Sequence, residues 1–168
     1  MFSSYAVEPL SKEHDILGFN CGVKELDIYL KERASQEVKK KITAVYVLHR
    51  KDSKKIIGYY TLSSFSIELI NLPDEIKKKL PKYPLLPASL IGRLAVDRKF
   101  QGKKIGTHLL IDALIRSYRL SKEIGSFAVI VDAKNEITKK FYKKYGFKQF
   151  RKKSLKLYLS MNTIEKLI

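Results

Sequence analysis

The pattern that most constrains the fold is strand, helix, strand in the second half of the chain. Residues 89–96 and 127–133 are apolar runs of strand length, and residues 105–120 carry leucine and alanine at the spacing of one helix face. A helix that joins two strands of one sheet makes them parallel, because the chain crosses back over the sheet between them. The sequence therefore predicts a mixed sheet that contains a parallel strand pair.

The flanking segments add antiparallel strands and further helices. Apolar alternation and turn residues predict earlier strands and a C-terminal hairpin, around residues 5–7, 43–48, 56–66, 147–150 and 155–160. Helices are expected over residues 24–39 and 74–80, from Asn135 to Gly146, and after a cap at Asn162. Three prolines predict an extended loop ahead of the first parallel strand, at Pro81, Pro84 and Pro87. With no repeat and no linker, the 168 residues are expected to form a single α/β (α+β) domain over 1–168.

Charge restricts the classes of partner. The chain has 34 Lys and Arg against 17 Asp and Glu, a formal net charge of +17, and from Arg98 onward 18 basic and 5 acidic residues give +13. Such a field attracts polyanions and repels cationic substrates, so a nucleic-acid partner is expected, although a lysine-rich surface can exist without any ligand. No apolar stretch approaches the ~18 residues of a membrane span, and the N-terminus lacks a signal-peptide pattern. A cytoplasmic protein without membrane attachment is expected.

Cysteine and histidine give little support to metal or nucleophilic chemistry. The single cysteine, Cys21, excludes an internal disulfide framework and is expected to be structural. The three histidines, His14, His49 and His108, do not stand at ligand spacing, so no metal site is expected.

A strand-to-helix junction at residues 94–106 is the strongest local signal. Gln101 and Gly102 open a short loop, and Lys103 and Lys104 lead into a helix. The first-turn amides of a helix lack intrahelical partners and lie at the positive end of its dipole, which suits a pyrophosphate. The loop is neither a GxGxxG nor a Walker sequence. A phosphate site and an ordinary turn that uses glycine for its geometry both stay open on this evidence.

A second signal follows the second parallel strand, in a helix that carries Phe141 and Tyr142. The two side chains lie about 100° apart on a helix, so one can pack inward while the other reaches a cleft edge. With a reference pKa near ~10, a tyrosine hydroxyl is protonated at neutral pH and suits a general acid. Aromatic residues are above all packing residues, so a structural role for the pair also stays open.

Together these segments resemble the GNAT superfamily of N-acetyltransferases. The phosphate-loop pattern of the family, Arg/Gln-x-x-Gly-x-Gly/Ala, is similar to residues 101–106. Gln101 and Gly106 match its first and last positions, and Lys104 replaces its middle glycine. The later strand–helix motif of the family is similar to residues 135–147.

The likeness narrows to the GNAT toxins of bacterial toxin–antitoxin modules. Their motifs are similar, in the same order, to residues 19–30, 58–63, 80–88 and 92–97. The resemblance extends from about residue 7 to residue 164 and implies acetyl transfer from acetyl-CoA to the free α-amino group of an aminoacyl-tRNA, which blocks translation. It also implies a small ribbon-helix-helix antitoxin as partner, and the positive charge after Asp97 suits a negatively charged cover.

The resemblance implies a fold and a site as well. The fold is the GNAT fold, a mixed, mostly antiparallel sheet with a central splayed parallel strand pair and flanking helices. Tyr142 is implied as the catalytic residue that protonates the leaving thiolate. Because an α-amino group is largely neutral near pH 7, no strong protein base is needed. The implied cofactor-binding residues are Leu94, Ala95, Val96, Gln101, Gly102, Lys103, Lys104, Ile105, Gly106, Thr107 and Asn135.

Contacts to the RNA are expected from basic side chains, namely Arg93, Arg33, Lys77 and Lys78. Arg93 stands out because it belongs to the strand that forms the expected active cleft. Two other functions stay open: a GNAT enzyme that acetylates a protein N-terminus, for example a ribosomal one, and a non-catalytic, basic nucleic-acid-binding module. Binding of acetyl-CoA separates the last from both enzymes. The oligomeric state is left open, with a homodimer among the options.

Overall fold

The computed structural model of the protein describes residues 2–150 and 154–168. Its strands are β1 (Tyr5–Pro9), β2 (Ala44–Arg50), β3 (Ile56–Glu68), β4 (Leu85–Val96), β5 (Ala128–Asp132), β6 (Lys148–Gln149) and β7 (Lys156–Ser160). Among the described residues these strands form a seven-stranded sheet in the order β1-β2-β3-β4-β5-β7-β6. β4 and β5 pair in parallel over Ala88–Ile91, whereas β1–β2, β2–β3, β5–β7 and β6–β7 pair antiparallel. The predicted mixed sheet with a parallel pair is therefore confirmed.

The helical segments are equally close to the prediction. They are α1 (Lys24–Ile28), the π-helical η2 (Tyr29–Arg33), α2 (Ala34–Lys39), α3 (Asp74–Lys77), α4 (Ile105–Ser121), α5 (Glu136–Lys144) and α6 (Met161–Leu167). Short 3-10 turns, η1, η3 and η4, cover Phe2–Ser4, Leu69–Asn71 and Arg98–Phe100. Of the helices in the described part of the chain, none is long and apolar enough to cross a membrane. The chain groups into two compact units: a first unit of the residues up to Ser63 with Gly92–Ala113, and a second of Ser64–Ile91 with Leu114–Ile168.

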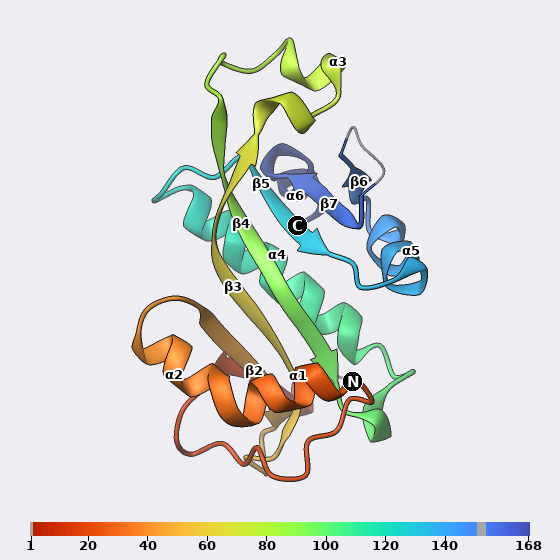
Figure 1. The fold of residues 1–168 in the computed structure, drawn as a ribbon. Helices are drawn as coiled ribbons and strands as arrows, with labels where there is room; N and C mark the ends of the chain where they lie inside the picture. The colour runs from red at the N-terminus through yellow and green to blue at the C-terminus, as the bar shows by residue number, and fades with distance from the viewer. Residues whose placement is uncertain (1, 151–153) are drawn as a thin grey trace. The chain divides into compact units, whose positions relative to one another are not determined.

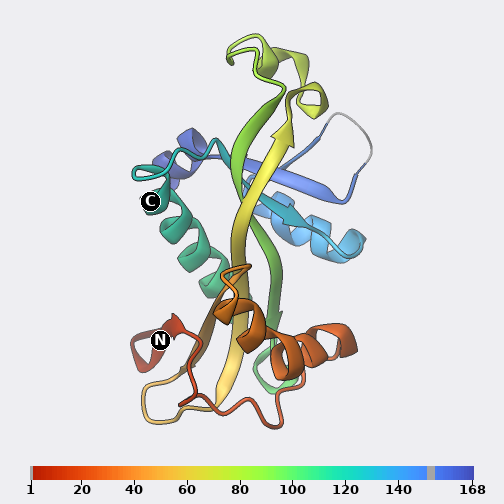
Figure 2. The same ribbon diagram turned by 60° about the vertical axis from the view of Figure 1, so that its left-hand side comes forward.

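The first unit is built around β1, β2 and the beginning of β3. A long loop, residues 10–23, leads from β1 to α1 and can be followed by its red to orange colour in Figures 1 and 2. Gly58 on β3 is a point of close packing, since a Cβ there would lie 2.8 Å from Leu109 Cδ1 and 3.0 Å from the Ala95 carbonyl oxygen. Glycine at this position lets α4 lie directly on the strands. The core of the unit consists of Cys21, Tyr29, Leu30, Ala34, Val45, Val47, Ile56, Tyr59 and Ala95.

The helix predicted over residues 24–39 is present but contains a π turn. α1 and α2 are separated by η2, in which Tyr29 and Leu30 are both 1% exposed. A π turn holds the same residue types as an α turn, so side-chain periodicity alone cannot locate it, and such turns are frequent at functional sites.

The second unit has β5 at its centre, with β4 and β7 on either side of it in the hydrogen-bonded order (Figure 1). Four residues of β5, Ala128–Val131, are fully buried. α5 follows β5 and ends before Gly146, whose φ of +96° is the left-handed conformation that a helix stop favours. A core cluster of this unit consists of Ile67, Leu72, Leu86, Ala88, Ala128, Ile130 and Tyr158.

The boundaries of two elements differ from the prediction. β4 begins at Leu85, so Pro87 lies inside a strand rather than in a loop; its φ suits an extended strand, and its carbonyl accepts the N–H of Phe127 at 2.8 Å. α6 is capped by Ser160 rather than Asn162, because β7 ends at Ser160 and its hydroxyl accepts the N–H of Thr163 at 3.2 Å. Residues 151–153, within the predicted C-terminal hairpin, lie outside the described residues.

Candidate active site

Two side chains fix the predicted phosphate loop after β4 in the first unit. Asp97 is 6% exposed, caps η4, and accepts the backbone N–H of Asn20 at 3.1 Å. Gln101 donates from Nε2 to the carbonyl oxygens of Cys21 and Val96, both at 2.9 Å. The first residue of the GNAT loop pattern therefore uses its side chain to hold the loop in place.

Lys104, which stands where the family pattern has its middle glycine, adopts a backbone conformation that favours glycine. Gly102 has φ +77° and Lys104 has φ +62°, so both adopt the left-handed conformation. Glycine enters this region freely, whereas an L-residue with a Cβ does so at a cost of about 1–2 kcal/mol. Lys104 thus adopts a conformation that glycine would enter freely, and it adds an ammonium group to the loop.

The loop opens the 17-residue helix α4. Ile105 is 2% exposed and anchors the first turn, and the N–H of His108 donates to the Lys104 carbonyl at 3.1 Å. Amides of a first helical turn point out of the helix at the positive end of its dipole. Lys103 and Lys104 are both exposed beside this turn. A left-handed loop, a long helix and two lysines together fit a multiply charged anion such as a pyrophosphate.

The end of β4 places Arg93 against the helical segment of the same unit. The guanidinium carbon lies 3.6 Å from the centroid of the Tyr29 ring, and the Arg93 N–H donates to Thr61 Oγ1 at 3.0 Å. Arg33 ends the π turn and is exposed. Both arginines that sequence analysis assigned to RNA binding therefore belong to the first unit, and one of them also packs against the core.

Tyr142, the predicted general acid, lies on α5 in the second unit and is 5% exposed. Its ring packs edge-to-face against Phe147 at 5.4 Å and Phe141 at 5.2 Å between centroids. Burial, with a smaller effect from the Asp132 carboxylate, raises the pKa of the Tyr142 hydroxyl well above its ordinary value. The hydroxyl therefore keeps its proton at neutral pH, as a general acid requires, and the two phenylalanines hold the ring.

The remaining predicted residues of the second unit have structural contacts. Asn135 caps α5, and its Oδ1 accepts from the Thr138 N–H at 2.9 Å and the Thr138 hydroxyl at 3.0 Å. The predicted cap is therefore confirmed. Because Oδ1 of Asn135 is used by the cap, the NH₂ group is the part of this side chain that can contact a cofactor. Lys77 ends α3 with its Nζ 3.7 Å from Asp74 Oδ1, and Lys78 follows it.

Cys21 is confirmed as a structural residue. It is 8% exposed, and burial together with a hydrogen bond to Asp27 raises the pKa of its thiol to about 11. A thiol that is protonated at neutral pH is a poor nucleophile.

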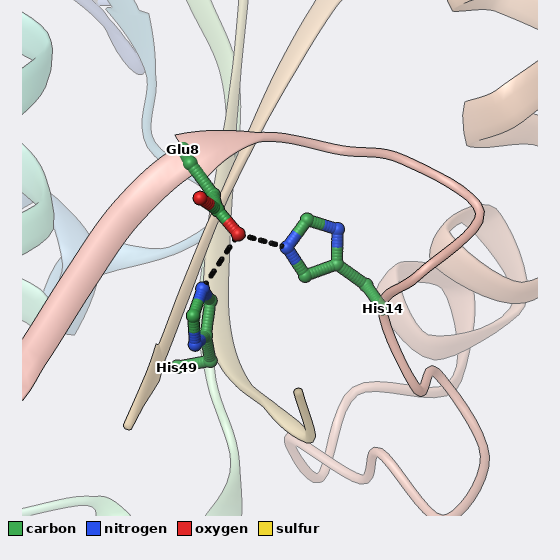
Figure 3. A group of neighbouring side chains, drawn as sticks. All are labelled: Glu8, His14 and His49. Carbon is green, nitrogen blue, oxygen red and sulfur yellow. Dashed lines mark hydrogen bonds and ion pairs between the residues drawn. The ribbon is translucent and has the colours of Figure 1, made fainter. Parts of the chain in front are cut away.

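A cluster of titratable side chains in the first unit was not expected from the sequence. Glu8 accepts hydrogen bonds from His14 at 2.7 Å and from His49 at 2.8 Å, and both histidines are buried (Figure 3). His14 and His49 are 35 positions apart in sequence, so the spacing of ligands along the chain gives no sign of the cluster. The pairing of β1 with β2 is the signal that could have found it, since it brings Glu8 opposite Val47, two residues from His49.

The sequence matches the family model of the acetyltransferase (GNAT) domain over residues 41–149. The protein is therefore a member of the GNAT acetyltransferases, which confirms the predicted fold and an acetyl-CoA-dependent acyltransferase as the class of enzyme. Among curated proteins, it is similar to the tRNA-acetylating toxin of Mycobacterium tuberculosis, with 32% identity over 159 residues that cover 95% of this chain and 93% of the toxin.

Several solved structures share the fold over nearly the whole chain. A mutant of KacT with a tyrosine replaced by phenylalanine has a TM-score of 0.93 at 32% identity, covering 98% of this chain and 99% of that one. AtaT complexed with acetyl-methionyl-tRNAfMet has a TM-score of 0.91 at 30% identity, covering 97% and 98%. A tyrosine-to-phenylalanine mutant of AtaT, bound to the C-terminus of the antitoxin AtaR and to acetyl-CoA, has a TM-score of 0.83 at 26% identity, covering 98% of both chains.

Proposed function

We propose that this protein transfers acetyl from acetyl-CoA to the α-amino group of an aminoacyl-tRNA and thereby blocks translation. The observation that carries the proposal is similarity over more than nine tenths of the chain to a tRNA-acetylating toxin and to AtaT in complex with acetyl-methionyl-tRNAfMet. The formal net charge of +17 supports an RNA substrate on separate, physical grounds.

The loop after β4 is the part of the chain that fits the cofactor. Left-handed Gly102 and Lys104 direct the backbone into the N-terminus of α4, and Lys103 and Lys104 add two positive charges beside it. We assign cofactor binding to residues 94–96 of β4, to residues 101–107 and to Asn135. When bound, acetyl-CoA supplies the acetyl thioester.

Tyr142 is the residue that we assign to proton delivery. When the α-amino nitrogen takes the acetyl group, the bond from the acetyl carbon to sulfur breaks and the nitrogen loses a proton to water. Tyr142 Oη gives a proton to the leaving thiolate and regains one from solvent. The raised pKa of Tyr142 ensures that the proton is present when the thiolate forms. The attacking amine needs no strong base, because an α-amino group has a reference pKa of ~7.7–8.0. Positioning of the two substrates then supplies most of the acceleration.

The proposed substrate, an aminoacyl-tRNA, also bears on the domain organisation, the compartment, the RNA contacts and the protein partner. The two units act as one acetyltransferase domain over residues 1–168, which agrees with a family model that spans residues of both. Because aminoacyl-tRNA is used in the cytoplasm, the protein is assigned to that compartment. RNA phosphates are assigned to Arg33, Arg93, Lys77 and Lys78. The AtaT–AtaR complex supports an antitoxin partner, and the net +13 after Asp97 supports a negatively charged segment in it. The ribbon-helix-helix type of this antitoxin is what the family resemblance implies.

The decisive experiment supplies labelled acetyl-CoA and bulk aminoacylated tRNA to the purified protein and identifies the released aminoacyl group by mass spectrometry. We expect N-acetylated amino acid with the wild-type protein and a large loss of product with Tyr142→Phe. Label that appears only on ribosomal or other protein N-termini would replace the proposal with the protein-acetylating alternative. Failure to bind acetyl-CoA in calorimetry would leave a non-catalytic basic module.

A further inference from the structure

Outside the assigned active site, the first unit holds a group of titratable side chains around one carboxylate oxygen, in which the two histidines are buried and Glu8 is half-buried. Oε1 of Glu8 on β1 lies 2.7 Å from His14 Nε2 and 2.8 Å from His49 Nε2 (Figure 3). The same oxygen lies 3.1 Å from Lys54 Nζ. His14 is 8% exposed and His49 is 3% exposed, and their rings lie 5.2 Å apart. The three donors come from the loop after β1, from β2 and from the turn before β3, so the cluster joins three segments to β1.

The partners of the other ring nitrogens indicate which nitrogens carry a proton. His49 Nδ1 faces the carbonyl oxygens of Arg50 at 2.7 Å and Ser53 at 2.9 Å, and a carbonyl oxygen can only accept. His49 Nε2 faces the Glu8 carboxylate, which also only accepts, so this geometry is satisfied by an imidazolium with both nitrogens protonated. His14 differs, because its Nδ1 accepts the Ser11 N–H at 3.0 Å and its Nε2 therefore carries the single proton of a neutral ring.

Two histidines and a glutamate are also a set that Zn²⁺ accepts, but the contacts here are those of hydrogen bonds. Ligand atoms around a tetrahedral zinc, with bonds of about 2.0–2.1 Å, stand roughly 3.3 Å apart. The two Glu8–histidine contacts are shorter than that, at 2.7 and 2.8 Å. His14 Nε2, which holds the proton of its ring, also has no lone pair to offer a metal. A carboxylate held by proton donors describes the cluster better.

The cluster stands at one end of a segment whose other end supports the phosphate loop. We call residues 10–22 the strap. Near its start, Asp15 is tied to the turn before β3, accepting the Ile56 N–H at 3.1 Å and donating its own N–H to the Lys54 carbonyl at 2.9 Å. At its far end, Asn20 accepts the Arg98 N–H at 2.8 Å, and the Cys21 carbonyl accepts from Gln101.

We infer that Glu8, His14 and His49 form a clasp that positions the strap, and through it the cofactor loop, and that the clasp is closed only while His49 carries protons on both ring nitrogens. Loss of either ring proton would set a lone pair of His49 against an acceptor. At Nε2 that acceptor is the Glu8 carboxylate at 2.8 Å, and at Nδ1 it is the carbonyl oxygens of Arg50 and Ser53 at 2.7 and 2.9 Å, so in either tautomer a present hydrogen bond would become a repulsion. The other charged groups facing the clasp are Lys54, bound to Glu8, and Glu13, 3.9 Å from Lys54. The part of the inference that concerns acetyl-CoA rests on the proposed function.

The protonation of the clasp can be read directly in the unmodified protein. Long-range ¹H–¹⁵N spectra of the histidine side chains at neutral pH are expected to show two protonated nitrogens for His49 and a proton on Nε2 alone for His14. A His49 ring with a proton on only one of its two nitrogens in the folded protein would overturn the inference. Addition of Zn²⁺ is expected to leave these signals in place; binding of the ion at both Nε2 atoms would make the cluster a metal site instead.

The link to the cofactor loop is tested by calorimetry with acetyl-CoA and by amide hydrogen exchange of residues 97–104. His49→Gln retains a donor but cannot titrate, and we expect acetyl-CoA affinity about three- to tenfold weaker and faster exchange in the loop. The wild-type affinity should fall as the spectra show His49 losing its second proton, whereas that of His49→Gln should stay flat. Asp52→Asn, which removes the partner of an exposed arginine on the same turn, is the matched control and should change neither readout.

Failure of the clasp and failure of the proposed function would give different results. Unchanged loop exchange and affinity in His49→Gln would show that the cluster does not position the loop. A wild-type protein that fails to bind acetyl-CoA would remove the proposed function, while the spectra and the exchange rates would still decide whether the clasp exists and supports the loop.

Discussion

The planar guanidinium of Arg93 lies on the face of the Tyr29 ring, with 3.6 Å between the guanidinium carbon and the ring centroid. Tyr29 is 1% exposed and in turn stacks on Tyr59, with 6.2 Å between their centroids. An arginine that sequence analysis assigned to RNA binding is thus held by a buried aromatic pair. The position of the Arg93 side chain is therefore fixed by packing, and this packing does not depend on which anion the guanidinium binds.

Replacement of Arg93 by lysine tests this packing, because lysine keeps the charge but lacks the flat group that stacks. We expect Arg93→Lys to lower the free energy of unfolding by about 0.5–2 kcal/mol, measured by urea denaturation. The matched control is Arg33→Lys, an exposed arginine, which should stay within about 0.5 kcal/mol of the wild type. Equal stability of the two variants would show that the contact with Tyr29 contributes nothing measurable.

The left-handed Lys104 gives a second prediction, in which stability and binding change in opposite directions. Lys104→Gly relieves the backbone strain and should leave stability unchanged or raise it by up to about 1 kcal/mol, yet weaken acetyl-CoA binding through the lost charge. Lys104→Ala loses the charge and keeps the strain, so it should be less stable than Lys104→Gly. Lys103→Ala removes a charge from a neighbour that is not left-handed and controls for charge alone. Thermal denaturation and calorimetry measure the two effects, and tighter binding by Lys104→Gly would contradict a role of the ammonium group.

The sequence predicted the elements that depend on local pattern. The apolar runs around Leu90 and Ile130 identified the parallel pair, and Asn135 was recognised as the cap of α5 because an asparagine before a helical run accepts a first-turn N–H. The loop motif was also recognisable, since its glycines and its place between a strand and a helix are local properties.

Features set by tertiary contacts were not predictable in this way. The π turn at Tyr29 and the strand conformation of Pro87 depend on what packs against them. The side chain of Gln101 reaches a carbonyl at Cys21, 80 positions away, so its structural role is invisible in the loop sequence. The Glu8 cluster likewise joins segments up to 46 positions apart.

Tyr142→Phe tests the assignment of the general acid. Removal of the hydroxyl should lower turnover with aminoacyl-tRNA by about 10²–10⁴, with the fold and acetyl-CoA affinity nearly intact, because the ring still packs on Phe147. Tyr145→Phe removes a hydroxyl from the same end of α5 and should retain most of the activity. The wild type and the two variants are compared by their single-turnover rates at saturating acetyl-CoA. A fully active Tyr142→Phe would leave the residue as a packing residue.

The clasp predicts that the free energy of unfolding decreases at acidic pH. Hydrogen bonds from Lys54, His14 and His49 lower the pKa of the Glu8 carboxyl from 4.5 to about 2. The unfolded chain then binds a proton at Glu8 at higher pH than the folded chain does, so the stabilisation is present above about pH 4.5 and is lost as the pH falls towards 2. In urea denaturation, the difference between wild type and Glu8→Gln should therefore shrink between about pH 4.5 and pH 2. A difference that is constant over this range would mean that the carboxylate charge has no part in it.

Salt dependence distinguishes an RNA acceptor from a protein one. If lysine and arginine side chains neutralise RNA phosphates, the logarithm of tRNA affinity should fall linearly with the logarithm of salt concentration, with a slope of about −0.7 to −0.9 for each phosphate contacted. Acetyl-CoA carries few charges, so its affinity should fall much less steeply. Lys77→Ala and Lys78→Ala should each reduce the tRNA slope by up to about one unit, while Lys12→Ala, which removes the charge of an exposed lysine not assigned to RNA binding, should not. Filter binding of tRNA and calorimetry of acetyl-CoA over the same salt series supply the two slopes, and equally shallow slopes would favour a protein N-terminus as the acceptor.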